Sequence, residues 1–248
     1  MSSFPDSSRP GIQVIRRAAR VLEAVGARNG VMRLADLDDA VGLAKTTAHR
    51  IVGALATERL LRVDADGRLW LGSALGALSG AAAAGLVNEL RPSLAELQAA
   101  IDETVDLSVL EGDAVRFVDQ VQSTQALRVV SAIGAAFPLH CTANGKAFLA
   151  AMPEEQAERL LQRPLGRFTP ATVTSAAAVL DELAQIRASG VAFDREEHTT
   201  GIAAVGALVT RDGVPFAAIS VPVPAERFAE RESELVLHLT AICRTAST

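Results

Sequence analysis

The chain contains few of the residues that usually cross-link or stiffen a protein. Its 248 residues include two cysteines, one tryptophan and no tyrosine, and aromatic residues make up 4% of the total. Two isolated cysteines exclude a disulfide framework and a CxxC metal or redox motif. The cores must therefore be filled by alanine, valine and leucine, and the cysteine usage favours a reducing, cytoplasmic location.

Long hydrophobic runs are also missing. The first ten residues are polar and contain no apolar signal-peptide segment. The most apolar stretch, residues 74–87, is rich in alanine and glycine and is too weakly hydrophobic to span a bilayer. These features predict a cytoplasmic protein with no membrane partner.

Charge is distributed unevenly along the chain, whose formal net charge is −5. Residues 1–80 carry 11 Lys and Arg against 8 Asp and Glu, a net charge of +3, whereas residues 81–248 carry 13 against 21, a net charge of −8. A mildly basic segment followed by an acidic one is typical of a DNA reader with an attached acidic module. We expect a DNA-binding domain at 11–72, a linker helix at 73–86 and a second domain at 87–246.

Residues 34–61 have the pattern of a helix-turn-helix. Apolar residues recur at helical spacing before and after Gly42, which permits a sharp turn between the two helices. An earlier helix should bury Val14, Ala18, Val21 and Val25 and end at Asn29–Gly30.

Two short alternating segments, 60–63 and 68–71, flank Asp64–Gly67 and predict a hairpin. Together with the preceding helices they outline a winged helix-turn-helix, whose second helix enters the DNA major groove.

The remainder of the chain mixes strand and helix patterns. The small residues of 72–85 predict a connecting helix that packs closely, against a second copy of the chain, or else a flexible linker. Beyond residue 87 the pattern favours an α+β domain with a largely antiparallel sheet. Strands are expected at 104–110, 114–121, 127–133, 191–193, 202–210 and 214–221.

No catalytic arrangement is complete. His140 and Cys141 are adjacent, so on a strand they point to opposite faces and cannot form a nucleophile–base pair. A metal set drawn from these two residues with Asp194, Glu196 and His198 fits no ligand signature. We therefore predict no enzyme activity, metal or cofactor; the rival hypothesis is an enzyme or carrier that uses the polar cluster at residues 140–146.

Six segments, taken in order and spacing, resemble the IclR family of bacterial transcriptional regulators. The resemblance implies a winged helix-turn-helix head, a linker helix and a C-terminal effector-binding domain of GAF-like fold. It also implies a homodimer or dimer of dimers that binds operator DNA and responds to a small metabolite, often a carboxylic or aromatic acid. The segments are 34–55, 66–72, 91–110, 134–150, 186–209 and 216–224.

Candidate DNA-binding residues cluster at the start of the third helix, because the N-terminal turns of a recognition helix meet base edges. Lys45 and Arg50 can neutralise phosphates or reach guanine. Thr47 falls on the apolar face and has packing as an alternative role. The full set is Lys45, Thr46, Thr47, His49, Arg50 and, in the wing, Arg68.

Candidate effector-binding residues lie near a predicted helix start at residues 140–146, where backbone N–H groups favour an anion. The resemblance aligns five residues with the family's pocket: Ala143, Asn144, Asp194, Ala204 and Ser220. Asp194 can accept a hydroxyl hydrogen and Ser220 can donate to a carboxylate. The structural alternatives are a cap or an ion pair with Arg195 or Lys146 for Asp194, and a strand hydroxyl bonded to the backbone for Ser220. Ala204 and Pro222 replace polar residues of some relatives, which favours a bulkier or partly apolar acid as effector.

Overall fold

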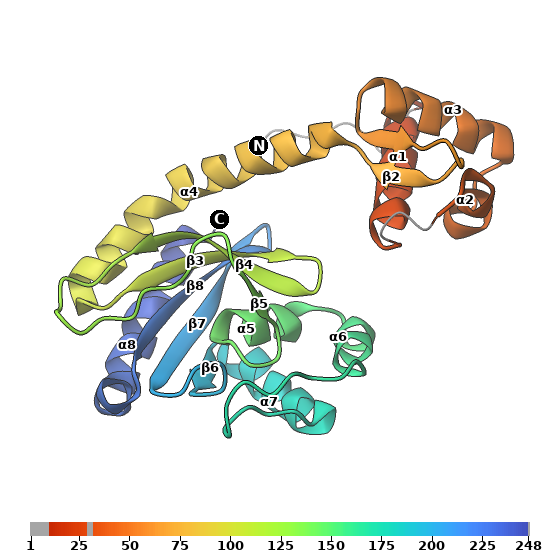
Figure 1. Cartoon of the computed structure of the whole chain (residues 1–248). Helices are drawn as coiled ribbons and strands as arrows, with labels where there is room; N and C mark the ends of the chain where they lie inside the picture. Colours follow the sequence, from red (N-terminus) through yellow and green to blue (C-terminus); the bar gives the residue numbers. More distant parts are fainter. Residues whose placement is uncertain (1–9, 29–31, 248) are drawn as a thin grey trace. The chain divides into compact units, whose positions relative to one another are not determined.

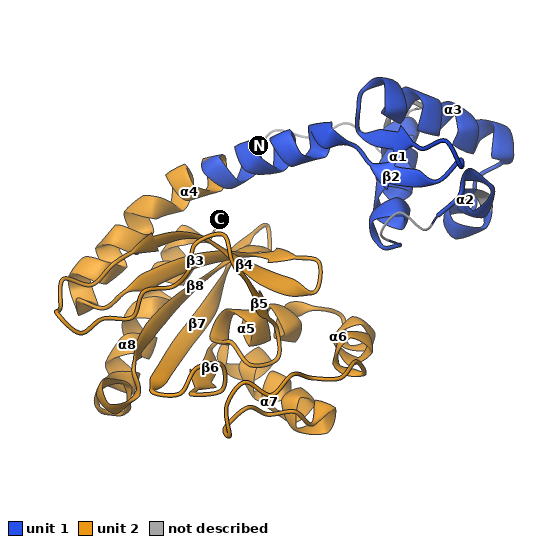
Figure 2. Ribbon diagram, viewed as in Figure 1, with its two compact units in different colours: residues 1–84 blue, residues 85–248 orange. Residues whose placement is uncertain are grey.

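The computed structural model describes residues 10–28 and 32–247, which form two compact units, Met1–Ala84 and Gly85–Thr248 (Figure 2). We call them the head and the C-terminal domain. Within the described ranges, no helix combines the length and the apolar character needed to cross a membrane.

The head contains three helices and a two-stranded hairpin around one hydrophobic core. Val21, Leu37, Ile51 and Leu69 are buried in this core, so the predicted apolar faces of the helices are found, as is the turn at Gly42, whose φ is +63°. Val14 was expected in the core but is 54% exposed, because the core ends before the first turns of its helix. The predicted stop at Asn29–Gly30 lies outside the described residues. The elements are α1 Pro10–Gly26, α2 Leu34–Val41, α3 Lys45–Thr57, β1 Leu61–Val63 and β2 Leu69–Leu71.

The hairpin is the predicted wing. Strands β1 and β2 pair antiparallel, with Arg62 opposite Trp70. The Asp64 carboxylate accepts hydrogen bonds from the backbone N–H groups of Asp66 and Arg68 and from Trp70 Nε1, which closes the turn. Gly67 adopts a φ of +75°, a conformation that other residues rarely tolerate.

One long helix, α4 (Ser73–Ile101), connects the two units. The sequence predicts a linker helix at 73–86, and the structure continues this helix through Pro92 to Ile101 without a break. Pro92 cannot donate a backbone hydrogen bond, but buried side chains before and after it, at Leu90 and Leu94, fix the helix against the C-terminal domain.

The C-terminal domain is built on an antiparallel six-stranded sheet in the order β5-β4-β3-β8-β7-β6, which agrees with the predicted α+β class (Figure 1). Its elements are β3 Val105–Glu111, β4 Ala114–Val121, β5 Ala136–Pro138, α5 Ala143–Ala151, α6 Glu154–Leu161, α7 Ala176–Ser189, β6 Ala192–Arg195, β7 Ile202–Arg211, β8 Val214–Pro224 and α8 Ala225–Ala246.

Helices cover both faces of this sheet. The C-terminal half of α4 and the buried side of α8 pack on one face, where Leu97, Val205, Ile219 and Leu235 are fully buried. Helices α5, α6 and α7 pack on the opposite face around Leu149 and other buried side chains. Each central strand therefore contributes alternate residues to two separate cores.

One predicted strand is absent, and one strand was not predicted. Residues 127–133 form no strand, because their backbone bonds to side chains instead of a neighbouring strand: Thr104 Oγ1 donates to the carbonyl of Val129, and Arg227 donates to that of Leu127. The short edge strand β5, which pairs with β4, was not predicted.

Candidate functional site

Helix α3 presents two chemically different faces. Ala48, Ile51, Val52 and Leu55 are buried in the core of the head, whereas Lys45, Thr46, His49 and Arg50 are exposed. Thr47 is half-buried and lines a groove between α1 and α3, next to Val14 and Ala18. Four of the five candidate residues of α3 are thus exposed, whereas Thr47 is turned towards α1; the exposed Arg50 lines the same groove.

The start of α3 is open to an anion. Its N-cap residue, Ala44, has an extended backbone and forms no side-chain capping bond. The first N–H groups of a helix lack partners within the helix and carry a partial positive charge. Lys45 adds a full positive charge at the same place, so this end of α3 is suited to a DNA phosphate.

The wing supplies two exposed arginines. Arg68, a candidate residue, is exposed, and its backbone N–H is fixed by Asp64 at 2.8 Å. The Arg62 guanidinium lies 5.3 Å from the ring centroid of Trp70 and stacks over it. Hydrogen bonds from Trp70 and Arg68 lower the pKa of Asp64, which keeps the turn-forming carboxylate ionised.

In the C-terminal domain, all five candidate effector residues line one cavity of about 250 Å³. Strand register explains why they meet: Asp194 pairs with Ala204 across β6 and β7, and Ala204 pairs with Pro222 on β8. Ser220, two residues from Pro222, points to the same face. Ala143 and Asn144 enter from the first turn of α5, where the Thr142 hydroxyl caps the helix by accepting from Gly145 N–H.

The sequence reasoning missed much of the remaining lining. Asp106 on β3 pairs with Ser220 and points to the same face. Phe117, Phe137 and His198 form an aromatic wall, with ring centroids 4.8 Å apart for the two phenylalanines and 5.0 Å for Phe137 and His198. The Asp106 and Ser108 positions alternate with buried Val105 and Leu107, a period-two signal that could have placed Asp106 opposite the hydrophobic core.

Two carboxyl groups of the cavity have raised pKa values. Burial raises the pKa of Asp106 to about 6, and hydrogen bonds from Ser131 and Gln120 oppose the shift. Burial also raises the pKa of Asp194 to about 7, with a further upward contribution from the nearby Glu197 carboxylate. Desolvation disfavours the charged form of a carboxylic acid, so the cavity resists negative charge.

The Lys146 ammonium, whose charge acts on Asp194, is already paired. Lys146 on α5 is fully buried, and its Nζ lies 2.7 Å from Glu182 Oε1 and 2.6 Å from Glu197 Oε1. No lysine or arginine lines the cavity among residues 10–28 and 32–247. The local charge is therefore dominated by carboxyl groups.

Asp194 has a structural role through one of its carboxylate oxygens. Its Oδ1 accepts hydrogen bonds from the backbone N–H groups of Glu197 and His198, which is one of the structural alternatives considered from the sequence. The other structural alternative, an ion pair with Lys146 or Arg195, is not formed, since Lys146 pairs with Glu182 and Glu197 and Arg195 pairs with Glu232.

The cluster at residues 140–146 has structural partners. His140 Nε2 donates to the carbonyl of Gly166, and Cys141 is fully buried. Burial, followed by the Asp194 and Glu197 carboxylates, raises the pKa of the Cys141 thiol to about 12, so a reactive thiolate is disfavoured. The environment of His140 and Cys141 gives no support to the rival enzyme hypothesis.

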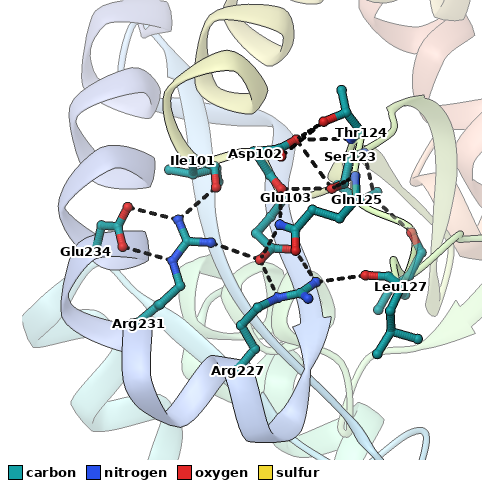
Figure 3. A network of polar contacts seen from close by, with 12 residues as sticks. Ile101, Asp102, Glu103, Ser123, Thr124, Gln125, Leu127, Arg227, Arg231 and Glu234 are labelled. Carbon is teal, nitrogen blue, oxygen red and sulfur yellow. Dashed lines mark hydrogen bonds and ion pairs between the residues drawn. The ribbon is translucent and has the colours of Figure 1, made fainter.

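A polar network connects the segment between β4 and β5, part of which lines the cavity, to the end of α4 (Figure 3). Glu103, which is 1% exposed, pairs with both Arg227 and Arg231 of α8. Asp102 accepts hydrogen bonds from Thr124, and Arg227 reaches the carbonyl of Leu127.

The same segment then lines the cavity. Residues 129–132 contribute to its wall, and the Ser131 hydroxyl donates to Asp106. Continuous contacts therefore run from Ile101, the last residue of α4, to the cavity.

The head is a winged helix-turn-helix with an exposed, basic second helix, and the C-terminal domain contains a cavity that suits a small molecule. These features define the class of DNA-binding transcriptional regulators. The family model described as IclR helix-turn-helix domain matches residues 14–65, and that described as Bacterial transcriptional regulator IclR C-terminal matches residues 80–248. The chain belongs to the IclR family of bacterial transcriptional regulators.

Similar proteins are regulators rather than enzymes. The chain is 47% identical to the HTH-type transcriptional regulator Rv1719 of Mycobacterium tuberculosis, over 95% of this chain and 92% of that protein. It is 35% identical to the HTH-type transcriptional regulator TtgV of Pseudomonas putida, over 91% and 86%. An IclR homolog from Microbacterium hydrocarbonoxydans, solved in complex with 4-hydroxybenzoate, is similar with a TM-score of 0.57 and 26% identity, over 94% of this chain and 99% of that one.

Proposed function

We propose that this regulator reads operator DNA through the exposed face of α3 and that a small molecule in the cavity of the C-terminal domain modulates that binding. The observation that carries the DNA part is the exposure of Lys45, His49 and Arg50 on α3, a helix whose other side chains hold it in the core of the head. Side chains at this position of a helix-turn-helix contact base edges and phosphates. Arg68 of the wing adds a backbone contact.

The cavity supports the proposal that a small molecule binds in the C-terminal domain. It is enclosed by candidate residues from four elements and bounded by aromatic side chains, as small-molecule sites usually are. A related protein was solved with 4-hydroxybenzoate, a single-ring ligand, which is consistent with a cavity of about 250 Å³.

The network around Glu103 provides a route from the cavity to DNA. A ligand that displaces residues 129–132 shifts a segment fixed by Asp102 and Glu103, which directly follow α4. Helix α4 continues by its covalent chain into the head at Ser73. Modulation also requires that the ligand bind two states of the protein with different affinity.

We further propose that the protein acts as a homodimer, with two copies of α3 spaced by one turn of DNA. Residues 76–82 of α4 are all exposed and include Leu78, which is 59% exposed, so this small-residue face has room for a second copy. Light scattering tests this: we expect a dimer for the wild type and a monomer for Ala81→Glu. A monomeric wild type would contradict it.

The DNA proposal is tested with Arg50→Ala. Operator fragments are first selected from genomic DNA with the wild-type protein, and affinities are then measured by fluorescence anisotropy. We expect Kd to rise about 10- to 100-fold and the salt slope to fall by about one, since a base-contacting arginine is worth about 1–3 kcal/mol.

The matched control is Arg244→Ala, which removes an exposed arginine of α8 and should leave Kd unchanged. If Arg50→Ala binds the operator as tightly as the wild type, α3 does not read DNA in the proposed way.

A further inference from the structure

The chemistry of the cavity restricts its ligand more narrowly than its shape does. Its volume of about 250 Å³ lies just below the ~300 Å³ lower limit for sites of drug-sized ligands, so it accommodates one ring with a small substituent. Phe117, Phe137 and His198 supply flat apolar surfaces against which such a ring packs.

Two carboxyl groups belong to the polar part of the lining, beside the hydroxyl groups of Ser131, Thr142, Thr199 and Ser220. Asp106 and Asp194 are 1% and 7% exposed. The amide oxygen of Asn144 is buried without a hydrogen-bond partner in the described part of the chain, while its nitrogen donates to Ser108 Oγ at 2.7 Å. The Asn144 oxygen lies against Gly206 and is not accessible, so the acceptor that a ligand donor meets in the cavity is the Asp194 carboxylate.

An ionised carboxylate meets a different environment. Asp106, Asp194 and Glu197 place three carboxyl groups in or next to the cavity, and Lys146, whose charge acts on Asp194, already bonds Glu182 and Glu197. The first turn of α5 provides N–H groups, but a helix terminus carries only about half a charge. Bringing a further buried negative charge into this site is unfavourable.

A hydroxyl group can bond both to the start of α5 and to the Asp194 carboxylate. Its oxygen can accept from the N–H groups at the start of α5, and its hydrogen can be donated to the side of Asp194 that does not hold Glu197 and His198. An ionised carboxylate accepts only, so it leaves Asp194 unpaired.

We propose that the cavity selects an uncharged single-ring aromatic compound that presents a hydroxyl group, and that it discriminates against the ionised carboxylate on the same ring. This inference rests on the proposed function, in which the cavity is the effector site. It departs from the acid effector predicted from the sequence.

Benzyl alcohol and benzoate are the matched probes, because they differ only in replacing a hydroxymethyl group with a carboxylate. Isothermal titration calorimetry on the full chain at about pH 8, above the pKa of about 7 of Asp194, should give at least about tenfold tighter binding of benzyl alcohol.

Asp194→Asn then tests the cause of the preference. Asparagine keeps an oxygen for the Glu197 and His198 amides and presents NH₂ in place of the second carboxylate oxygen. Benzoate should gain affinity by about tenfold, and the ratio between the probes should fall towards one. Benzoate that binds wild type as tightly as benzyl alcohol, an unchanged ratio in Asp194→Asn, or no binding of benzyl alcohol at millimolar concentration would each overturn the inference.

A second variant separates this inference from the proposed function. Ala204→Leu fills the cavity from β7 and should abolish binding of both probes. If both still bind that variant, the cavity is not the effector site and the proposed function fails there. If benzoate is preferred and its binding is lost in Ala204→Leu, the site stands and the ligand class is wrong.

Discussion

The head and the C-terminal domain use charge in opposite ways. Among the head residues whose burial the structure describes, every buried side chain is hydrophobic, and its lysines and arginines lie at or near the surface. The C-terminal domain buries Glu103, Asp106, Lys146, Asp194 and Glu197. One protein thus has a surface whose interactions depend on salt and an interior whose interactions depend on protonation.

Exposed and buried charges respond differently to salt and to the loss of a partner. Exposed cations bind DNA by releasing counterions, so their contribution falls steeply with ionic strength. Buried charges are screened little by salt, but each depends on its partner, because an unpaired charge in the interior is costly.

The largest effect is expected from breaking the Lys146 pairs. Lys146→Met leaves Glu197, which is 5% exposed, without its cation, and should lower the free energy of unfolding by about 3–5 kcal/mol. Urea denaturation measures the change. The double variant Lys146→Met/Glu197→Gln removes the orphaned charge and should recover part of the loss; a single variant within about 1 kcal/mol of wild type would contradict the account.

The second effect concerns pH. Folding raises the pKa of Asp194 from 3.8 to about 7, so its contribution to stability is largest at low pH and is lost as pH rises through that window. Asp194→Asn does not titrate. Relative to wild type it should gain stability between about pH 5 and pH 8, on the order of a few kcal/mol, since one pKa unit corresponds to about 1.4 kcal/mol.

Thermal unfolding of both proteins at the two pH values measures this relative gain. Glu197, Lys146 and His198 surround the carboxyl group and are unchanged in the comparison, and Asp106 titrates in both proteins. A difference between the proteins that does not vary with pH would show that Asp194 is not desolvated as described.

The smallest effect compares two helix starts. Helix α3 begins at Ala44 without a side-chain cap, whereas Thr142 caps α5. Ala44→Ser should stabilise the head by about 1 kcal/mol, and Thr142→Ala should destabilise the C-terminal domain by a similar amount. Differential scanning calorimetry distinguishes the signs; equal signs for the two variants would refute the comparison.

Much of the head could be predicted from the sequence because its signals are local. The turn at Gly42, the apolar spacing of α3 and the Asp64–Gly67 hairpin each depend on neighbouring residues. The exposed positions of Lys45 and Arg50 follow from the same periodicity.

The cavity was harder to predict because its chemistry depends on distant partners. Lys146 meets Glu182, 36 residues away, and Asp106 meets Ser131 across a segment whose alternating pattern resembles a strand. The continuity of α4 through Pro92 depends on packing with the C-terminal domain, which no local pattern reveals. Residues of the pocket could be named from family resemblance, but its excess of carboxyl groups could not.

The most direct test of the central claim measures operator affinity with and without saturating benzyl alcohol. Coupling between two sites is typically worth about 1–3 kcal/mol, so Kd should change by at least about fivefold in the wild type. In Asp102→Gly, which keeps the positive φ of residue 102 but removes its bonds to Thr124, the change should shrink, whereas Asp212→Gly, another positive-φ aspartate, should behave as wild type. An operator Kd that is identical with and without bound ligand would contradict the account.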